Sequence, residues 1–214
     1  MIDLSGSQAA TAAREQEVVG QAPRIPPVDR EANAEAVIAP TGRLREAIVG
    51  KDAPPMTLDQ IPEIMFTMCR WPELWERYMA VSIHLQGPQG RLEPRDRQLA
   101  ILRTAWLLQA PFEWGEHVKT SKRVGITGEE VERVITGSSA PGWSAHDAAI
   151  LRAAEELRER VMVSDETWSE LGQKLDDGQC VELLILIGQF TTTAYFQNSL
   201  RLQLEPGSEG LSAR

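Results

Sequence analysis

The stretch PRDRQLAILRTAWLLQAPFEWGEHVKTSKRVG, residues 94–125, decides the fold. Apolar residues between Leu99 and Leu108 cover most faces of the helix that opens this stretch, so we expect that helix at the centre of a core. Pro111 interrupts the helix, and a further helix then runs to Gly125. No part of the stretch alternates apolar and polar residues for long enough to predict a strand.

The same helical periodicity continues on both sides. An apolar stripe at three- and four-residue steps runs from Leu74 to Leu85. Ser144 and Ser164 are typical helix caps, and Thr127-Gly128-Glu129-Glu130 has the spacing of a capping box. A last helix is expected from about residue 178 to residue 204. The sequence therefore predicts an all-α, single-domain bundle of about eight helices.

The two ends of the chain lack a periodic apolar face. Residues 1–30 are rich in small and polar residues and include a proline-rich run, and residues 206–214 are similar in character. We expect a flexible N-terminal arm over residues 1–30, the helical domain over 31–205, and a flexible tail over 206–214.

Composition excludes several classes of protein. The chain has 214 residues, 42% of them hydrophobic and 25% charged, which is typical of a globular protein. Its net charge of −9 argues against nucleic acid or anionic lipid as a partner. The first residues lack the basic start and apolar run of a secretory signal, and the apolar run 181–196 is too short and too polar to span a bilayer. We expect a cytoplasmic protein without a membrane partner.

Cysteine and histidine spacing gives no support for a metal site. Cys69 and Cys180 are far apart and lie among apolar neighbours, so we interpret them as small buried residues in a reducing compartment. His84, His117 and His146 show no metal-ligand spacing, and no nucleotide-binding or hydrolase motif occurs. We expect no metal and no cofactor, with His84 partly buried in a structural role and His146 at the surface beside a helix start.

Glu113 and His117 are the first candidates for chemistry. They are four residues apart on one predicted helix, so the side chains share a face and can form a hydrogen bond. Such a pair is either a general acid/base or an ordinary surface ion pair. Because the helix follows the most apolar segment, Glu113 is expected to point inward. Arg103, inside that apolar segment, is either part of a structural salt bridge or an anchor for a carboxylate substrate.

Three segments together resemble a known family. Residues 92–103 (LEPRDRQLAILR), 112–117 (FEWGEH) and 124–131 (VGITGEEV) are similar to the carboxymuconolactone decarboxylase family, which includes the alkylhydroperoxidase D-like proteins. The resemblance covers roughly residues 54–204. It implies an all-helical fold with a core helical hairpin, assembled into trimers or hexamers with pockets near subunit contacts.

The redox motif of the peroxidase branch is missing from this chain. That branch opens a helix with CxxCxxxH, and alignment on His117 places Ala110 and Glu113 at the two cysteine positions. The proton-relay glutamate of the branch falls on Gln98, whose amide orients a group by hydrogen bonding but does not relay a proton in the same way. These replacements argue against thiol peroxidase activity.

The decarboxylase branch implies a metal-free lyase or isomerase that acts on a small organic acid, lactone or aromatic breakdown product. On this resemblance His117 is the acid/base and Glu113 orients or assists it. We expect Arg103 or Arg97 to bind a substrate carboxylate, and Gln98 also to contact the substrate. Trp106, Trp114 and Tyr195 are expected to form pocket walls, although tryptophan at such positions is also common in an ordinary core.

Two other functions stay open. One is a peroxide-reducing oxidoreductase that uses Cys69 or Cys180. The other is a non-catalytic, oligomeric binding protein in which Glu113 and His117 form only a structural bond. The expected partners are a small-molecule substrate and further copies of the same chain.

Overall fold

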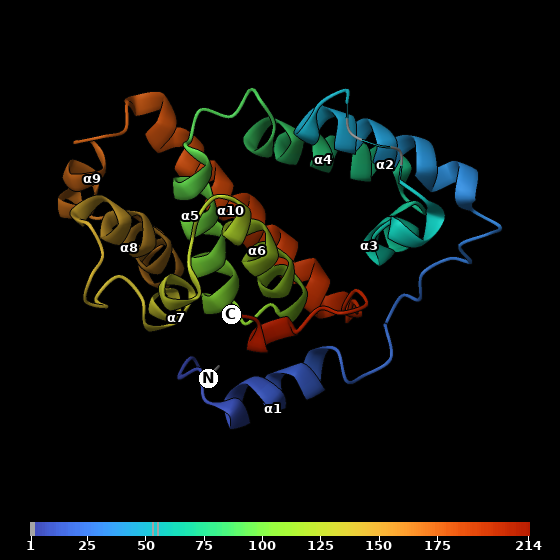
Figure 1. Cartoon of the computed structure of the whole chain (residues 1–214), viewed down its shortest axis with the longest axis horizontal. Helices are drawn as coiled ribbons and strands as arrows, with labels where there is room; N and C mark the ends of the chain where they lie inside the picture. Colours follow the sequence, from blue (N-terminus) through green and yellow to red (C-terminus); the bar gives the residue numbers. More distant parts are fainter. Residues whose placement is uncertain (1–2, 53, 55) are drawn as a thin grey trace. The chain divides into compact units, whose positions relative to one another are not determined.

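The computed structural model describes residues 3–52, 54 and 56–214 and is helical throughout these residues (Figure 1). In order, the elements are α1 Gln8–Val18, α2 Ala34–Val49, the 3₁₀ helix η1 Leu58–Gln60, α3 Glu63–Met68, α4 Pro72–Gln86, α5 Pro94–Leu107, α6 Pro111–Arg123, α7 Gly128–Thr136, α8 Ala145–Arg160, α9 Asp165–Leu171, α10 Asp177–Leu200 and the 3₁₀ helix η2 Gly210–Ser212. The described residues contain no strand, so the predicted all-α class is confirmed, with ten α-helices where about eight were expected.

The chain groups into two compact units. The first comprises Leu92–Arg214 together with the chain up to Gln21, and the second comprises Ala22–Arg91. The second unit is built from α2, α3 and α4. Within it, the Arg30 guanidinium lies over the Phe66 ring, 4.4 Å from the centroid, and donates hydrogen bonds to the Leu58 and Ile61 carbonyls. This arginine ties the segment before α2 to the start of α3.

Helix α5 is the centre of the first unit. It packs against α6, α7, α8 and α10, and Figure 1 shows it running among them. Every residue from Gln98 to Leu107 is buried, as expected for a helix that is apolar on most faces. Pro94 and Pro111 occupy the first positions of α5 and α6, where the missing N–H costs nothing. The two prolines therefore set the start of both helices that carry the candidate residues.

The helix starts follow the local signals in the sequence. Thr127 and Glu130 form the predicted capping box of α7, and the Ser144 and Ser164 side chains cap α8 and α9. Asp176 adds a capping box at the start of α10 that the sequence analysis did not single out. Each cap satisfies backbone N–H groups that have no partner within the helix.

The predicted flexible segments contain ordered structure in this fold. Residues 8–18 form α1 and residues 210–212 form η2, and these two elements pack against each other. The Glu15 carboxylate accepts a hydrogen bond from the Leu211 N–H, and Leu211 is fully buried. Neither segment has an apolar periodicity of its own, which is why sequence patterns did not predict them. Their order comes from packing on the rest of the unit.

A glycine on α6 allows the tail to come close. A Cβ at Gly115 would lie 2.5 Å from the Ser208 hydroxyl and 3.2 Å from the Gly210 nitrogen, so a side chain here would displace the tail. The tail in turn covers Trp114, whose indole N–H donates to the Ala213 carbonyl at 3.1 Å.

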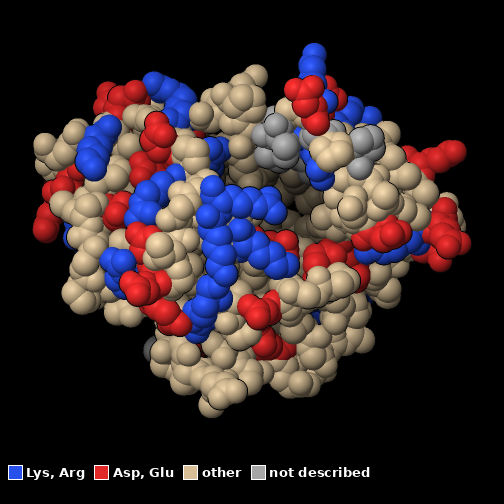
Figure 2. All heavy atoms as spheres, viewed as in Figure 1, with Lys and Arg blue, Asp and Glu red and all other residues tan. Residues whose placement is uncertain are grey.

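Charged side chains of both signs are interleaved over α7, α8 and α9 on the face shown in Figure 2. None of the described helices combines the length and apolar composition that a bilayer crossing requires.

Candidate functional site

His117 lies at the contact of three helices of the first unit. Its Nδ1 is 2.9 Å from the Gln98 side-chain oxygen of α5, and its ring packs edge-on against Phe190 of α10, with 5.0 Å between centroids. The histidine is half-buried, and both neighbours are buried. Two of the predicted site residues, His117 and Gln98, are therefore in direct contact, and the contact holds the imidazole in one orientation.

This environment determines the protonation of the imidazole. Burial lowers the pKa of His117 to about 4, because the apolar surroundings disfavour the imidazolium form. His117 is therefore neutral at pH 7. Since the Gln98 oxygen only accepts hydrogen bonds, Nδ1 carries the proton and donates it, which leaves the lone pair on Nε2. A neutral imidazole with a free Nε2 lone pair is a base.

Glu113 points inward, as the sequence predicted, and is only 2% exposed. Its Oε2 atom has no hydrogen-bond partner among the residues that the structure describes. Burial raises the pKa of Glu113 well above its ordinary value, so the side chain holds a proton beyond the usual range. A buried, unsatisfied carboxyl group costs stability, which is typical of a functional position.

The predicted hydrogen bond between Glu113 and His117 is not formed within the described structure. His117 bonds to Gln98 instead, so the orienting role assigned to Glu113 falls to Gln98. Helical spacing still places Glu113 and His117 on the same face of α6. The arrangement thus brings a neutral base and a buried carboxyl group with a raised pKa to one helix face.

Arg97 lies one residue before Gln98 and is half-buried. Desolvation lowers the pKa of its guanidinium, and the nearby carboxylates of Glu182 and Glu93 act in the opposite direction. Glu182 is itself buried on α10 and accepts a hydrogen bond from the Leu92 N–H at 3.0 Å. The arginine stays a cation in this setting, close in sequence to the His117 partner.

Arg103 forms a structural salt bridge, which is one of the two roles that the sequence left open for it. Its Nε donates to Glu155 at 2.8 Å, and its Nη1 donates to the carbonyls of Val134 and Ile135 at 2.8 and 2.9 Å. The side chain therefore pairs α5 with α8 and caps the end of α7. The salt bridge that the sequence left open is formed with Glu155.

Trp106 and Trp114 are core residues. Both are completely buried, and their rings pack against each other with 4.8 Å between centroids. Their indole N–H groups are satisfied by chain segments far away in sequence, Leu4 O for Trp106 at 3.3 Å and Ala213 O for Trp114. Packing of the chain ends over the two rings accounts for their complete burial, in line with the ordinary core role that the sequence left open.

Tyr195 lines a cavity of about 310 Å³ between α5, α8 and α10, together with Thr104, Thr191 and Arg158. His117 is not among the lining residues of this cavity. Tyr195 is 58% exposed.

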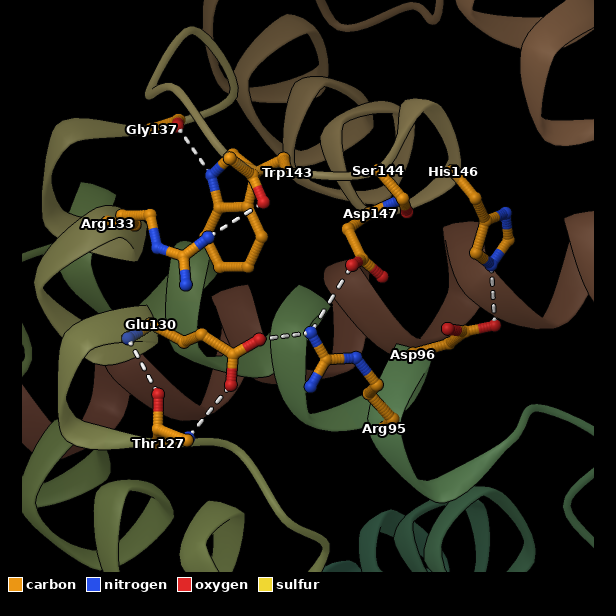
Figure 3. Close-up of polar contacts among 11 residues, drawn as sticks. Arg95, Asp96, Thr127, Glu130, Arg133, Gly137, Trp143, Ser144, His146 and Asp147 are labelled. Atoms are coloured by element: carbon orange, nitrogen blue, oxygen red, sulfur yellow. Dashed lines mark hydrogen bonds and ion pairs between the residues drawn. The ribbon is translucent and has the colours of Figure 1, made fainter.

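A second polar cluster joins the starts of α5, α7 and α8 (Figure 3). Arg95 lies between Glu130 and Asp147, 2.5 and 3.2 Å from their carboxylate oxygens. Beside it, His146 points toward Asp96 and lies 2.8 Å from its carboxylate. His146 is buried, which corrects the prediction of a surface histidine: the buried Asp96 of α5 supplies its partner. The cluster fixes how these helices meet.

Sequence patterns did not single out two residues that lie at the site. Phe190 packs on His117, and Glu182 lies near Arg97. An acidic residue inside the apolar run 181–196 was a signal for a buried partner, whereas Phe190 is indistinguishable from core by its sequence context.

Within the described residues, no group of three or more His, Cys, Asp or Glu side chains lies close enough together to hold a metal ion. Cys69 and Cys180 are both unpaired thiols, and burial raises the pKa of each.

Comparison with known proteins finds a family match over part of the chain and solved structures of the same fold. Residues 70–156 match the carboxymuconolactone decarboxylase family. Among curated proteins, none matches the chain in sequence.

Solved structures share this architecture. ATU0492 from Agrobacterium tumefaciens, a protein of unknown function whose proposed role is that of the antioxidant defence protein AhpD, is 21% identical with a TM-score of 0.59 over 64% of this chain and 94% of its own. The debrominase Bmp8, as a cysteine-to-alanine variant bound to 2,3,4-tribromopyrrole, is 13% identical with a TM-score of 0.68. The match covers 87% of this chain and 94% of the Bmp8 chain. Apo Bmp8 is 12% identical to this chain with a TM-score of 0.67. The match covers 86% of this chain and 92% of the apo Bmp8 chain. At these identities the likeness establishes the fold alone.

Proposed function

We propose, because residues 70–156 match the carboxymuconolactone decarboxylase family, that this chain is a cofactor-independent acid/base enzyme of the decarboxylase, lyase or isomerase type. Its substrate is a small organic acid, lactone or aromatic breakdown product. The observation that carries this proposal is the pairing on α6 of a neutral imidazole, held by Gln98, with a buried carboxyl group that has an unsatisfied oxygen.

His117 is the general base of the proposed reaction. Its proton sits on Nδ1, where Gln98 accepts it, so Nε2 is available to take a proton from the substrate. The lowered pKa keeps this atom unprotonated over the whole physiological range. Gln98 is a positioning residue, because it fixes the tautomer and the ring orientation without itself reacting.

Glu113 is the general acid. With its raised pKa it carries the proton needed at the atom that becomes electron-rich when the substrate bond breaks. In one turnover Nε2 of His117 removes a proton, the electron pair of that bond moves into the substrate, and Glu113 protonates the position that receives the electrons. Return of the proton from His117 to Glu113 restores both groups.

The similarity of this fold to that of Bmp8 supports a small cyclic or aromatic substrate, because Bmp8 binds a small aromatic ring. Bmp8 binds 2,3,4-tribromopyrrole on the same fold. In this chain the buried Phe190 ring packs against the His117 ring, so the surroundings of the imidazole are apolar. Arg97, which lies near the Glu182 and Glu93 carboxylates, is the other arginine that the sequence assigned to a substrate carboxylate.

Two further expectations belong to the proposal. Two unpaired cysteines are usual in a reducing, cytoplasmic compartment. Val181, Ile185 and Tyr195 on α10 are each about half exposed, and this apolar surface supports assembly with further copies of the chain.

The peroxide-reducing alternative has little support from the thiols. Burial raises the pKa of both cysteines, which disfavours the reactive thiolate. Thiol alkylation of the native protein followed by a peroxide assay tests this alternative, and peroxide turnover that alkylation abolishes would favour it.

The acid/base proposal is tested with a panel of small lactones and aromatic acids. We expect His117→Asn and Glu113→Gln each to lower kcat/KM by about 100- to 10,000-fold on the substrate that the panel identifies. Gln98→Ala should cost less, roughly tenfold, because it removes only positioning.

His84→Asn is the matched control. His84 lies on α4 in the other unit and is exposed, which corrects the expected partly buried position. It should keep kcat/KM within about twofold of the wild type. Full turnover by His117→Asn would contradict the proposal. If a panel compound binds but none is turned over, and if its affinity is the same in both site variants, the result would favour the non-catalytic binding protein.

A further inference from the structure

The second unit contains a cavity of its own. Helices α2, α3 and α4 surround a volume of about 360 Å³. Small-molecule sites in proteins start at about 300 Å³. The cavity lies within Ala22–Arg91, outside the unit that carries His117.

Most of the cavity wall is apolar. Val37, Met65 and Trp75 line it and are almost completely buried, and Met79 and Ile83 extend the same wall. The Trp75 ring stacks on Tyr78 with 5.6 Å between centroids, so its orientation is fixed. Methionine side chains adapt to the shape of a bound group. The wall therefore suits a ring or a short hydrocarbon chain.

One polar side chain borders the cavity on α2, beyond the apolar residue Val37. Arg43 lines it, and none of the ion pairs that the described residues form involves this guanidinium. One turn earlier, Pro40 lies inside α2 and has no N–H, so the Ala36 carbonyl lacks its usual helical donor. Ala36 and Pro40 both line the cavity. One cation and one carbonyl acceptor thus stand beside an apolar surface.

We propose that this cavity binds a small hydrophobic monocarboxylic acid. The hydrocarbon part lies against Val37, Met65 and Trp75, and the carboxylate pairs with Arg43. Glu76 also borders the cavity and is exposed. Its negative charge repels an anion, so the carboxylate lies at the α2 side and a second carboxylate on the ligand is disfavoured.

Isothermal titration calorimetry of the full chain with phenylbutyrate and its neutral analogue phenylbutanol tests the proposal. The wild type should bind the acid more tightly than the alcohol. Arg43→Gln should weaken the acid roughly tenfold, as expected for loss of one charge-assisted contact, and leave the alcohol within about twofold. Glu76→Gln should bind the acid as tightly as the wild type or more tightly.

Arg45→Gln is the matched control, because Arg45 lies on the same helix and does not line the cavity. It should leave both affinities unchanged. Equal binding of acid and alcohol, or the same loss in Arg45→Gln as in Arg43→Gln, would overturn the assignment of Arg43. Absence of binding by either probe would overturn the site.

Cys69 gives a second readout that needs no substitution. It borders the cavity, whereas Cys180 lies in the other unit. Phenylbutyrate should slow alkylation of Cys69 by N-ethylmaleimide, measured by peptide mass spectrometry, and leave the rate at Cys180 unchanged. An unchanged rate at Cys69 under saturating probe would contradict occupancy of the cavity.

Discussion

His117 is neutral in the folded chain because burial disfavours its charged form, and this has a consequence for stability. The unfolded chain takes up a proton near pH 6.5, whereas the folded chain does so only near pH 4. Between these values the unfolded state binds more protons, so stability falls as the pH falls. We expect a loss of about 2–3 kcal/mol between pH 6.5 and pH 4, measured by urea unfolding.

His117→Asn should lack this part of the pH dependence, and His84→Asn should retain it. Direct titration of the imidazole by NMR should give a midpoint near 4 for His117. Gln98→Glu should raise that midpoint, because a carboxylate beside Nδ1 favours the imidazolium. A midpoint near 6.5 in the wild type would show that the ring is hydrated and would remove the case for a permanently neutral base.

At the scale of elements, Arg103 connects α5, α7 and α8. Arg103→Ala removes three hydrogen bonds and leaves Glu155 without its cation, so we expect a loss of about 3–5 kcal/mol in the free energy of unfolding. Arg158→Ala, at an exposed position of α8, should change stability by less than about 0.5 kcal/mol. Unchanged stability together with a raised KM in Arg103→Ala would restore Arg103 as a substrate anchor.

The same connection explains Gly137 at the end of α7. Its φ is +107°, and a Cβ there would lie 2.5 Å from the Arg103 guanidinium and 2.6 Å from the Glu155 carboxylate. Glycine is required here for two reasons. Its φ is in the region that favours glycine, and a side chain would collide with the ion pair of Arg103 and Glu155.

For the whole first unit, the tail is part of the core. Leu211 is fully buried beside α1, so Leu211→Ala should lower the free energy of unfolding by about 2–5 kcal/mol. The tryptophan emission should shift to the red as Trp114 becomes hydrated. Ser212→Ala, at an exposed neighbour, serves as the control and should leave both measurements unchanged. Wild-type stability in Leu211→Ala would return the tail to the flexible segment that the sequence predicted.

The sequence predicted what depends on local chemistry. Helices α5 and α6 follow from their apolar pattern and their prolines, and the α7 cap follows from Thr127 and Glu130. The inward position of Glu113 follows from its place after the most apolar segment. These features need only neighbours within a few residues.

Pairings between distant segments were not predictable in this way. Asp96 and His146 are 50 residues apart, and nothing near His146 distinguishes a buried histidine from a surface one. His117 bonds to Gln98 and not to the expected Glu113, and this depends on how α5 and α6 pack. Likewise, the burial of Trp106 and Trp114 depends on chain ends that carry no helical signal of their own.

The two tryptophans also set an order of events during synthesis. Trp106 is bonded to a residue made 102 positions earlier, and Trp114 to one made 99 positions later. At translation rates of about 5–20 residues per second, Trp114 waits roughly 5–20 seconds for its acceptor. Until Ala213 is made, the Trp114 indole N–H lacks the carbonyl that accepts its hydrogen bond in the folded unit, and the tail cannot cover this ring.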